Sequence, residues 1–253
     1  VASELSTILT GEHRTDENKA RDQYRHPKQV IEFLGIKPTD RVLEMWPGTG
    51  WYSEILAPYV KSKGQFIAAT FATDGLDSDD RRQAFWSKVS SKYREKMSDV
   101  SLYGHVEFCE FVDGMFGEDM SPENVDVVLI VRALHVWDEM GHMQQGLQSI
   151  YEALKPGGTL GIIQHRADTV SKRASSAGEG YMDQRYVIDA AVQVGFKFEE
   201  ASDINQNPKD TKDYPKGVYA LPPTLAMGSL NRDEYMAIGE SDRMTLKSTK
   251  PVL

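Results

Sequence analysis

The sequence predicts an α/β fold: a three-layer sandwich in which helices cover both faces of a seven-stranded, mostly parallel sheet. Three observations predict it. Val125–Val131 is a continuous apolar run, as a strand buried on both faces requires. Segments with helical spacing alternate with such runs along the chain. A glycine turn joins the first strand to the helix after it, which makes the predicted sandwich Rossmann-like.

The segment Arg41–Val60 contains that glycine turn. An apolar strand at 42–45 is interrupted by Gly48 and Gly50, and the apolar spacing then becomes helical. Glycine lets the backbone approach a ligand closely, and the helix after it directs free N–H groups at the same place. With Glu44 at the strand end, the turn is typical of a nucleotide site at the carboxyl edge of a parallel sheet.

Composition narrows the class of protein. The chain has 253 residues, of which 40% are hydrophobic and 26% charged, as in ordinary globular domains. A net charge of −9 without a basic cluster gives no support to nucleic acid as a partner. No apolar run approaches the roughly 18 residues of a membrane helix. Cys109 is the only cysteine, so neither an intrachain disulfide nor a thiolate metal cluster is expected.

The chain is predicted to form a single domain in three parts. These parts are an N-terminal arm with cap helices at 1–35, a Rossmann-like core at 40–221 and a C-terminal extension at 222–253. Val1–Asn18 is interpreted as an irregular arm because it is polar and lacks a periodic pattern. Pro27 then opens a helix that Gly35 ends.

Strands and helices alternate after the first turn. The further strands are expected at 65–69, 106–111, 125–131, 159–163, 196–202 and 217–221. The helices between them are expected at 79–98, 143–154 and 183–194. Residues 205–216, before the last strand, are rich in Asn, Asp, Lys and Pro, a composition that fits either a solvated loop or a lid over a site.

The glycine turn resembles the first motif of class I, Rossmann-like S-adenosylmethionine-dependent methyltransferases, in which an acidic residue alternates with three glycines. Glu44, Gly48 and Gly50 match this motif, whereas Trp46 stands where the first glycine is expected. Leu-Lys-Pro-Gly-Gly at 154–158, just before an apolar strand, resembles a second recurring feature of these enzymes. The wider similarity is to a bacterial subfamily of predicted methyltransferases with a Trp-Pro-Gly variant of the first motif. It extends over residues 25–250 and includes the segments 207–212 and 239–247.

The resemblance implies a cofactor, S-adenosyl-L-methionine, and an antiparallel last strand in the sheet. Glu44, Gly48 and Gly50 would position the amino-acid portion of the cofactor. Trp46 would narrow the methionine end of the pocket.

Three further residues are expected to bind the cofactor. Thr70 occupies the place of the acidic residue that binds the ribose hydroxyls in these enzymes, with Asp74 or Asp77 as substitutes from the loop. Asp113 follows the next strand and would contact the adenine amino group, unless it only caps a turn. Arg132 comes directly after the strand at 125–131, where it would complete the cofactor site or hold an anionic group of the substrate.

The substrate side is expected to contain two histidines. His135 lies in a Leu-His-x-x-Asp stretch similar to that of many small-molecule methyltransferases, and His165 ends the strand at 159–163. Both are candidate catalytic residues, because the pKa of histidine lies near neutrality. The candidate substrate-binding residues are Arg25, His26, Arg166 and Tyr181. Packed histidines and surface arginines are the plainer alternatives, and no metal is predicted, since no close His-x-His spacing supports one.

The resemblance implies methyl transfer from S-adenosylmethionine to a small-molecule acceptor, an activity of EC class 2.1.1. The alternative is a protein of the same fold that binds S-adenosylmethionine or S-adenosylhomocysteine without methyl transfer, because Trp46 and Thr70 depart from the pattern. A nicotinamide-dependent oxidoreductase is disfavoured, since the turn lacks the third glycine of Gly-x-Gly-x-x-Gly. The cofactor favours the cytoplasm, whereas a chain that begins at Val1 leaves export to the periplasm open. The oligomeric state also stays open.

Overall fold

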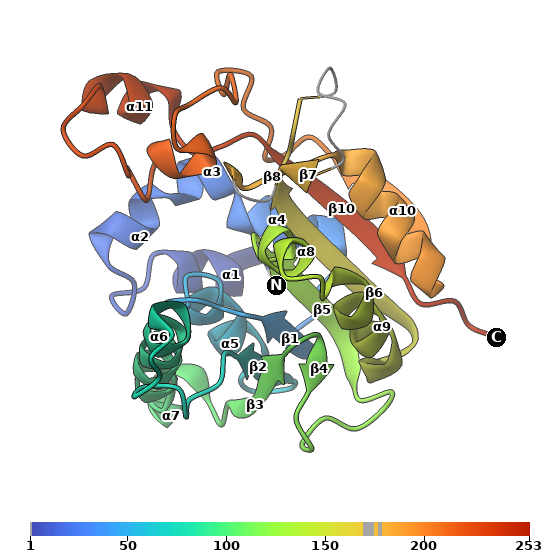
Figure 1. The fold of residues 1–253 in the computed structure, drawn as a ribbon. Helices are drawn as coiled ribbons and strands as arrows, with labels where there is room; N and C mark the ends of the chain where they lie inside the picture. The colour runs from blue at the N-terminus through green and yellow to red at the C-terminus, as the bar shows by residue number, and fades with distance from the viewer. Residues whose placement is uncertain (1, 169–174, 177–178) are drawn as a thin grey trace.

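An eight-stranded sheet forms the centre of the computed structural model, which describes residues 2–168, 175–176 and 179–253 (Figure 1). The strands lie in the order β4 (Met115–Phe116), β3 (Glu107–Val112), β2 (Gln65–Thr70), β1 (Arg41–Met45), β5 (Val125–Val131), β6 (Leu154–His165), β10 (Arg243–Thr249) and β9 (Lys197–Ser202). The five strands from β3 to β6 in this order are parallel, and β10 is antiparallel to both β6 and β9. The predicted Rossmann-like fold class and the antiparallel strand are therefore confirmed.

Helices surround this sheet. Before β1 come α1 (Ala2–Leu9), α2 (Asp16–Ala20), α3 (Asp22–Arg25) and α4 (Pro27–Leu34). Within the alternating part come α5 (Ser53–Val60), α6 (Arg81–Met97), α7 (Val100–Tyr103), α8 (Leu134–Glu139), α9 (Met143–Ala153) and α10 (Gln184–Val194). The 3-10 helix η2 (Gly217–Ala220) and α11 (Arg232–Ile238) lie between β9 and β10, and β7 (Ser175–Ser176) pairs antiparallel with β8 (Tyr181–Met182).

The helices form two layers because alternate residues of each strand point to opposite faces of the sheet. Leu43 of β1 belongs to one core, which it shares with residues of α8, α9 and α10 such as Leu147 and Val187. Val42 belongs to the other core, which it shares with residues of α1, α4, α5 and α6 such as Ile31 and Ile55. Figure 1 shows α10 and α9 on one side of the sheet and α1 and α5 on the other. The three-layer sandwich is thus the consequence of strands that are apolar on both faces.

β1 occupies the position that matters for ligand binding. It pairs with β2 on one side and with β5 on the other, so the strand order reverses on its two sides. At such a point the connections leave the sheet in opposite directions, and a crevice opens at the carboxyl ends of the two strands. The glycine turn follows β1 at this crevice, as the sequence predicts.

The structure corrects the end of the predicted sheet. Residues 217–221 were expected to form its last strand, but Gly217–Ala220 is a 3-10 helix and the antiparallel strand is β10. β10 pairs along its whole length with β6, from Arg243 opposite His165 to Thr249 opposite Thr159. Residues 243–249 of the predicted C-terminal extension therefore belong to the central sheet.

Two other expectations about the fold differ from the structure. The sheet has eight strands where seven were expected, because a short return at Met115–Phe116 pairs with β3. The N-terminal arm contains a helix, α1, although it was expected to be irregular. Leu5 of α1 is buried in the core beside α5, so packing and not a long periodic pattern explains this helix.

Candidate active site

The glycine turn after β1 bends through backbone conformations that favour glycine. Trp46, Gly48 and Gly50 have φ angles of 45°, 62° and 91°. A Cβ atom on Gly48 would meet nothing within 4 Å, whereas one on Gly50 would lie 3.0 Å from the Tyr93 ring. Gly48 therefore faces open space, and Gly50 allows close packing of the turn. Trp46 adopts its left-handed conformation without being glycine, which few large residues do.

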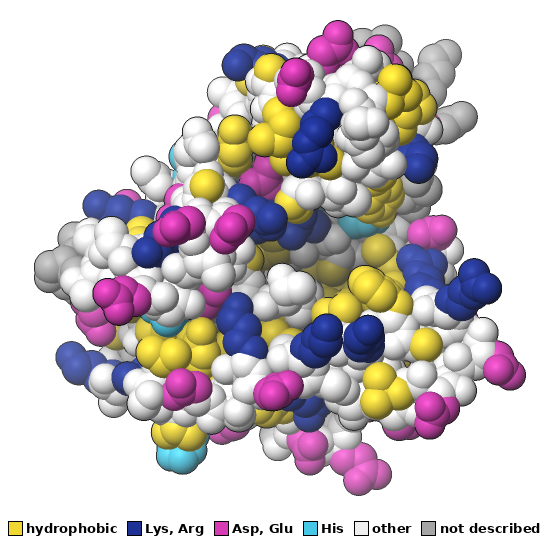
Figure 2. Space-filling view, turned by 90° about the vertical axis from the view of Figure 1, so that its left-hand side faces the viewer, with side chains coloured by type: hydrophobic (Ala, Val, Ile, Leu, Met, Phe, Trp, Pro, Cys, Tyr) yellow, Lys and Arg dark blue, Asp and Glu magenta, His cyan; other side chains and the backbone are white. Residues whose placement is uncertain are grey.

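A cavity of about 310 Å³ opens beside this turn at the carboxyl ends of β1, β5 and β6. Its walls include Arg21, Arg25, Glu44, Trp46, Gly48, Trp51, Tyr52, Arg132, His135, His165 and Tyr219. We call it the cationic cavity, because three of its lining side chains are arginines. Figure 2 shows the molecule hollowed between an upper and a lower part, with Lys and Arg side chains around the hollow. Of the predicted site residues, seven line this cavity: Arg25, Glu44, Trp46, Gly48, Arg132, His135 and His165.

The arginines at this cavity outnumber the carboxylates that neutralise them. Arg25 binds Glu240 through two nitrogens, with distances of 2.7 to 3.1 Å, and Arg243 reaches the same carboxylate at 3.0 Å. These two arginines lower the pKa of Glu240 to about 2, against the opposing effect of burial. The guanidinium of Arg132 forms no ion pair with any residue that the structure describes, and its Nε is buried without a hydrogen-bond partner.

Arg132 is held in an unfavourable environment. It follows β5 with a φ angle of 57°, a conformation that few residues with a long side chain adopt. Burial lowers the pKa of Arg132 well below its usual range, and the neighbouring charges of Arg25 and Arg243 lower it further. The Arg132 side chain is half-buried and its Nε is buried without a hydrogen-bond partner, which is costly to a fold, and an anionic ligand at this guanidinium would offset the cost.

Glu44 lies beneath the turn and is buried, with 2% of its surface exposed. Ser53 Oγ donates to its carboxyl group at 3.0 Å, and Tyr93 completes a chain of hydroxyl contacts at 2.8 Å from Ser53. Burial raises the pKa of Glu44 to about 8, although Ser53 and Lys96 oppose the rise. Glu44 therefore carries a proton at neutral pH and adds no negative charge to the cationic cavity.

His135 is neutral and fully hydrogen-bonded. The side-chain nitrogen of Gln164 lies 3.1 Å from the carbonyl oxygen of Gly180, which can only accept, so this nitrogen is the NH₂ donor of the amide. The same nitrogen lies 3.0 Å from His135 Nδ1. Nδ1 is therefore the acceptor, so the ring proton is on Nε2, which points to the hydroxyl of Tyr219 at 3.2 Å. Burial lowers the pKa of His135 to about 4. Both ring nitrogens thus have partners, and His135 and Tyr219 line the cavity together.

His165 faces the same cavity from the end of β6. Its Nδ1 lies 2.5 Å from Ser241 Oγ, which also accepts from Arg243 Nε at 3.1 Å. Burial, followed by the charge of Arg243, lowers the pKa of His165 well below its usual range. The two histidine rings lie 5.6 Å apart, so the predicted neighbourhood of His135 and His165 at the crevice is present.

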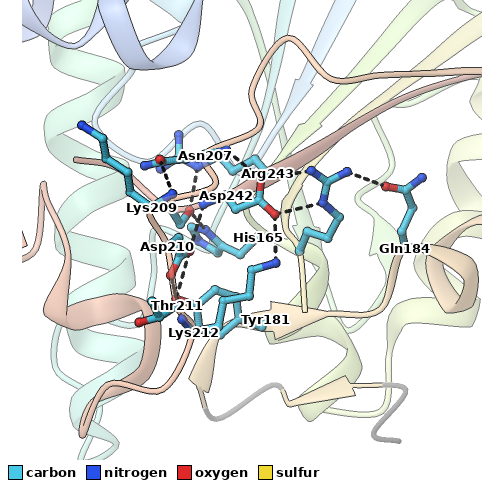
Figure 3. A network of polar contacts seen from close by, with 12 residues as sticks. His165, Tyr181, Gln184, Asn207, Lys209, Asp210, Thr211, Lys212, Asp242 and Arg243 are labelled. Atoms are coloured by element: carbon cyan, nitrogen blue, oxygen red, sulfur yellow. Dashed lines mark hydrogen bonds and ion pairs between the residues drawn. The ribbon is translucent and has the colours of Figure 1, made fainter. Parts of the chain in front are cut away.

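Arg166 and Tyr181, which were predicted to bind substrate, belong to a buried polar network behind this cavity (Figure 3). Arg166 donates to both oxygens of Asp242 at 3.0 Å, and Lys212 reaches Asp242 at 2.9 Å. Tyr181 donates to Asp210 at 3.0 Å, and Asp210 also accepts from the backbone N–H of Asp242 at 2.9 Å. The network ties residues 205–216 to the start of β10. Neither Arg166 nor Tyr181 lines the cationic cavity.

A second cavity of about 240 Å³ lies on the other side of Trp46, beyond the ends of β2 and β3. Its walls include Phe71, Trp86 and Phe111, and Asp113 stands at its edge with 67% of its side chain exposed. We call it the aromatic cavity. Asp113 forms an ion pair with His142 when that histidine is protonated, at 3.2 Å.

The indole of Trp46 is the wall between the two cavities. Its Nε1–H donates to the carbonyl of Phe111 at 2.8 Å. Its ring packs against Phe71, Trp86 and Trp137, with centroid distances of 4.7, 5.1 and 5.6 Å. Because the N–H bond and three ring contacts hold it, the indole occupies the middle of the crevice. A ligand that reaches both cavities must pass this side chain.

Thr70 and His26 lie outside both cavities. The Thr70 hydroxyl is buried, donates to the carbonyl of Phe71 at 2.9 Å and accepts from Arg94 at 2.9 Å. His26 lies 3.2 Å from the side chain of Asn205 through its Nδ1. Gly50 shapes the turn without lining a cavity. Sequence reasoning missed Tyr219 and Arg21, because the segment around Tyr219 was interpreted as a strand and no motif singled out Arg21.

The described residues contain no group of three or more His, Cys, Asp or Glu side chains arranged to hold a metal ion. Among the same residues, no helix combines the length and the apolar character that crossing a lipid bilayer would require.

The sequence is similar to characterised enzymes over part of its length. The ubiquinone/menaquinone biosynthesis C-methyltransferase UbiE of Ectopseudomonas mendocina is 29% identical over 136 residues, which cover 53% of this chain and 45% of that enzyme. UbiE of Pseudomonas savastanoi is 28% identical over 153 residues, which cover 60% of this chain and 52% of that enzyme. The chain thus spans about half the length of the curated relatives it matches. No protein-family model matches it.

Solved structures match nearly the whole chain. A S-adenosylmethionine-dependent methyltransferase from Aquifex aeolicus has a TM-score of 0.61 at 15% identity, covering 97% of this chain and 98% of its own. The [4+2]-cyclase SpnF has a TM-score of 0.63 at 16% identity, and the match covers 96% of this chain and 86% of SpnF. A methyltransferase-like protein from Bacillus halodurans has a TM-score of 0.57 at 14% identity, and the match covers 90% of this chain and 100% of that protein. The resemblance to class I methyltransferases is confirmed in sequence and in fold; the Trp-Pro-Gly subfamily stays a prediction.

Proposed function

We propose that the protein transfers a methyl group from S-adenosylmethionine to a small-molecule acceptor. The observation that carries the proposal is the pair of cavities on either side of the glycine turn. One is lined by arginines and the other by aromatic rings, at the strand ends where a Rossmann-like fold binds its ligand. The UbiE relatives, which are methyltransferases by name, support it.

The residues at the two ends of the crevice fit the two ends of this cofactor. Arg21, between the N-terminal helices α2 and α3, suits a carboxylate. Phe71, Trp86 and the exposed carboxylate of Asp113 suit an adenine ring and its amino group. When bound, the cofactor supplies an electrophilic methyl group on a sulfonium, which a nucleophile of the acceptor takes while the carbon–sulfur bond breaks. Gly48 leaves the space above the turn that such a ligand needs.

The protein's own contribution is to orient the acceptor. Tyr219 presents its hydroxyl to the cationic cavity and is held there by the Nε2–H of His135. Because His135 already donates this proton, it acts as a positioning residue, and the Tyr219 hydroxyl is the group that contacts the acceptor. His165 keeps a neutral ring at the same wall and remains the candidate for accepting a proton.

A second candidate function is binding of a nucleoside or another ligand without methyl transfer. It is favoured by the indole of Trp46 across the crevice and by Thr70, whose hydroxyl is bonded to Arg94 where a free carboxylate would bind ribose. The [4+2]-cyclase among the similar structures is, by its name, a member of this fold with a different activity. The two functions differ in whether a methylated product forms.

Calorimetric titration with S-adenosylhomocysteine tests the proposed function. Gly48→Val should weaken binding at least about tenfold, because the side chain enters the space above the turn. Gly228→Val is the matched control: Gly228 also has a positive φ angle, 66°, with nothing within 4 Å of its Cβ position. Both variants carry the same backbone strain, so only loss of ligand space separates them. Equal affinity in the two variants, or no binding by the wild type at millimolar ligand, would overturn the proposal.

A further inference from the structure

We propose that the methyl acceptor is an organic anion, whose charged group is bound by Arg132 with the hydroxyl of Tyr219. That this anion is the methyl acceptor rests on the proposed function, whereas the anion site itself rests on the geometry of the cationic cavity. Both residues line that cavity, Arg132 from the end of β5 and Tyr219 from η2.

The charge balance of the cavity requires an anion from outside the protein. Arg25, Arg132 and Arg243 share one carboxylate, Glu240, whose oxygens already accept from Arg25 and Arg243. Glu44, the other acid at the cavity, is protonated at neutral pH and contributes no charge. Arg132 and Arg21 are therefore the lining arginines without an ion pair among the described residues, and Arg132 Nε is in addition buried without a hydrogen-bond partner. A carboxylate, sulfonate or phosphate at the Arg132 guanidinium would supply paired, charge-assisted hydrogen bonds.

The position of Arg132 favours the acceptor over the cofactor as the source of this anion. Arg21 lies between α2 and α3 at the N-terminal side of the cavity, and because Glu240 already binds Arg25, Arg21 is the arginine there that suits the carboxylate of the cofactor. Arg132 shares its wall with His135, His165 and Tyr219, the residues next to the proposed acceptor. Trp51 and Tyr52 add aromatic surface, so an anion with an aromatic or planar body fits the remaining space.

This arrangement couples the two ligands. A sulfonium near an unpaired guanidinium is repelled, and an anion on Arg132 removes that repulsion. The anion should therefore raise the affinity for S-adenosylmethionine, and by linkage the cofactor should raise the affinity for the anion by the same factor. S-adenosylhomocysteine has a neutral sulfur, so the coupling with it should be weaker.

The test uses benzoate as the anionic probe and benzamide as its neutral isostere, at constant ionic strength. We expect benzoate, and not benzamide, to raise the melting temperature of the protein, since a ligand of the native state stabilises it. We also expect benzoate to increase the affinity for S-adenosylmethionine more than that for S-adenosylhomocysteine in calorimetric titrations. Benzamide with the same effect as benzoate would contradict the proposal.

Arg132→Met removes the charge and keeps most of the side-chain volume. It should weaken benzoate binding roughly 30-fold or more, as loss of a buried charge partner does. The melting temperature without ligand should rise at the same time, because an unpaired buried cation is gone. Arg132→Lys should retain part of the benzoate response, and Tyr219→Phe should weaken it roughly threefold through the lost hydrogen bond. Arg185→Met, at an exposed arginine of α10, is the control for net charge.

The outcomes separate the anion site from the proposed function. If Arg132→Met loses binding of S-adenosylhomocysteine as well, Arg132 holds the cofactor carboxylate and the inference is wrong. If the wild type binds S-adenosylhomocysteine but responds equally to benzoate and benzamide, the inference fails while the cofactor site of the proposed function stands. If it responds to benzoate through Arg132 but binds no cofactor, the anion site is upheld and the proposed function fails.

Discussion

Replacing Glu44 by Gln should make the protein more stable, and more so as the pH rises. Burial raises the pKa of Glu44 from 4.5 to about 8, with Ser53 and Lys96 opposing the rise. Between these two values the folded protein keeps a proton that the unfolded chain has lost. The unfolding free energy contributed by this residue is therefore greatest below the unfolded pKa, and it declines as the pH rises to the folded pKa.

The size of the effect follows from the pKa difference. A shift from 4.5 to about 8 corresponds to a penalty of about 5 kcal/mol once the pH exceeds both values. Gln has no proton to lose, and its side-chain oxygen can still accept from Ser53. The difference in unfolding free energy between Glu44→Gln and the wild type should therefore grow by about 4 kcal/mol from pH 5 to pH 8.5.

Urea denaturation of both proteins at pH 5, 7 and 8.5 measures this difference. Other groups titrate alike in the two proteins, so their contributions cancel. Glu234→Gln, at an exposed position of α11, is the matched control and should show no growth with pH. A difference for Glu44→Gln that stays constant from pH 5 to pH 8.5 would refute the reasoning, because Glu44 would then ionise alike in both states.

Two further predictions concern the wall between the cavities and the polar network. Trp46→Gly should join the two cavities and raise the affinity for S-adenosylhomocysteine, while the loss of its ring contacts lowers the unfolding free energy by about 3 kcal/mol. Titration calorimetry and urea denaturation check both parts, and a variant with unchanged or weaker ligand affinity would show that the indole does not obstruct the crevice. Arg166→Met should cost about 3 kcal/mol of stability, because Asp242 loses its bidentate partner. Its affinity for S-adenosylhomocysteine should stay unchanged, and a clear loss would place Arg166 in ligand binding after all.

The part of the fold that sequence could predict is the part with a strong local pattern. The strand at 125–131 and the helix from Pro27 to Leu34 have the predicted bounds, because an apolar run and a Pro-to-Gly helix signal need no distant partner. The strand at 243–249 was missed. Its Met-Thr-Leu core is short, and its place in the sheet depends on β6 and β9, which are distant in sequence. Long-range pairing is information that local periodicity does not contain.

The candidate site shows the same division. His135, His165 and Arg132 follow strand ends, so their convergence at one crevice could be predicted from the topology of parallel strands. The hydrogen bonds that decide their roles could not. Tyr219 lines the cavity and Glu240 binds Arg25 beside it; both lie between β9 and β10, and only the fold brings them to His135 and Arg25. Arg166 and Tyr181 carry suitable chemistry but are used in a structural network.

The insertion between β9 and β10 has a consequence for how this protein can change its specificity. Residues 203–242, which we call the roof, connect the neighbouring antiparallel strands β9 and β10. Within the roof Asp210 accepts from the backbone N–H of Asp242, and it also accepts from Tyr181. The strands of the sheet and the glycine turn lie outside this segment, whereas its Glu240 binds Arg25 and must be kept. Exchanging the roof between related chains, with its two anchoring strands kept, is therefore a route to new acceptor preferences on an unchanged scaffold.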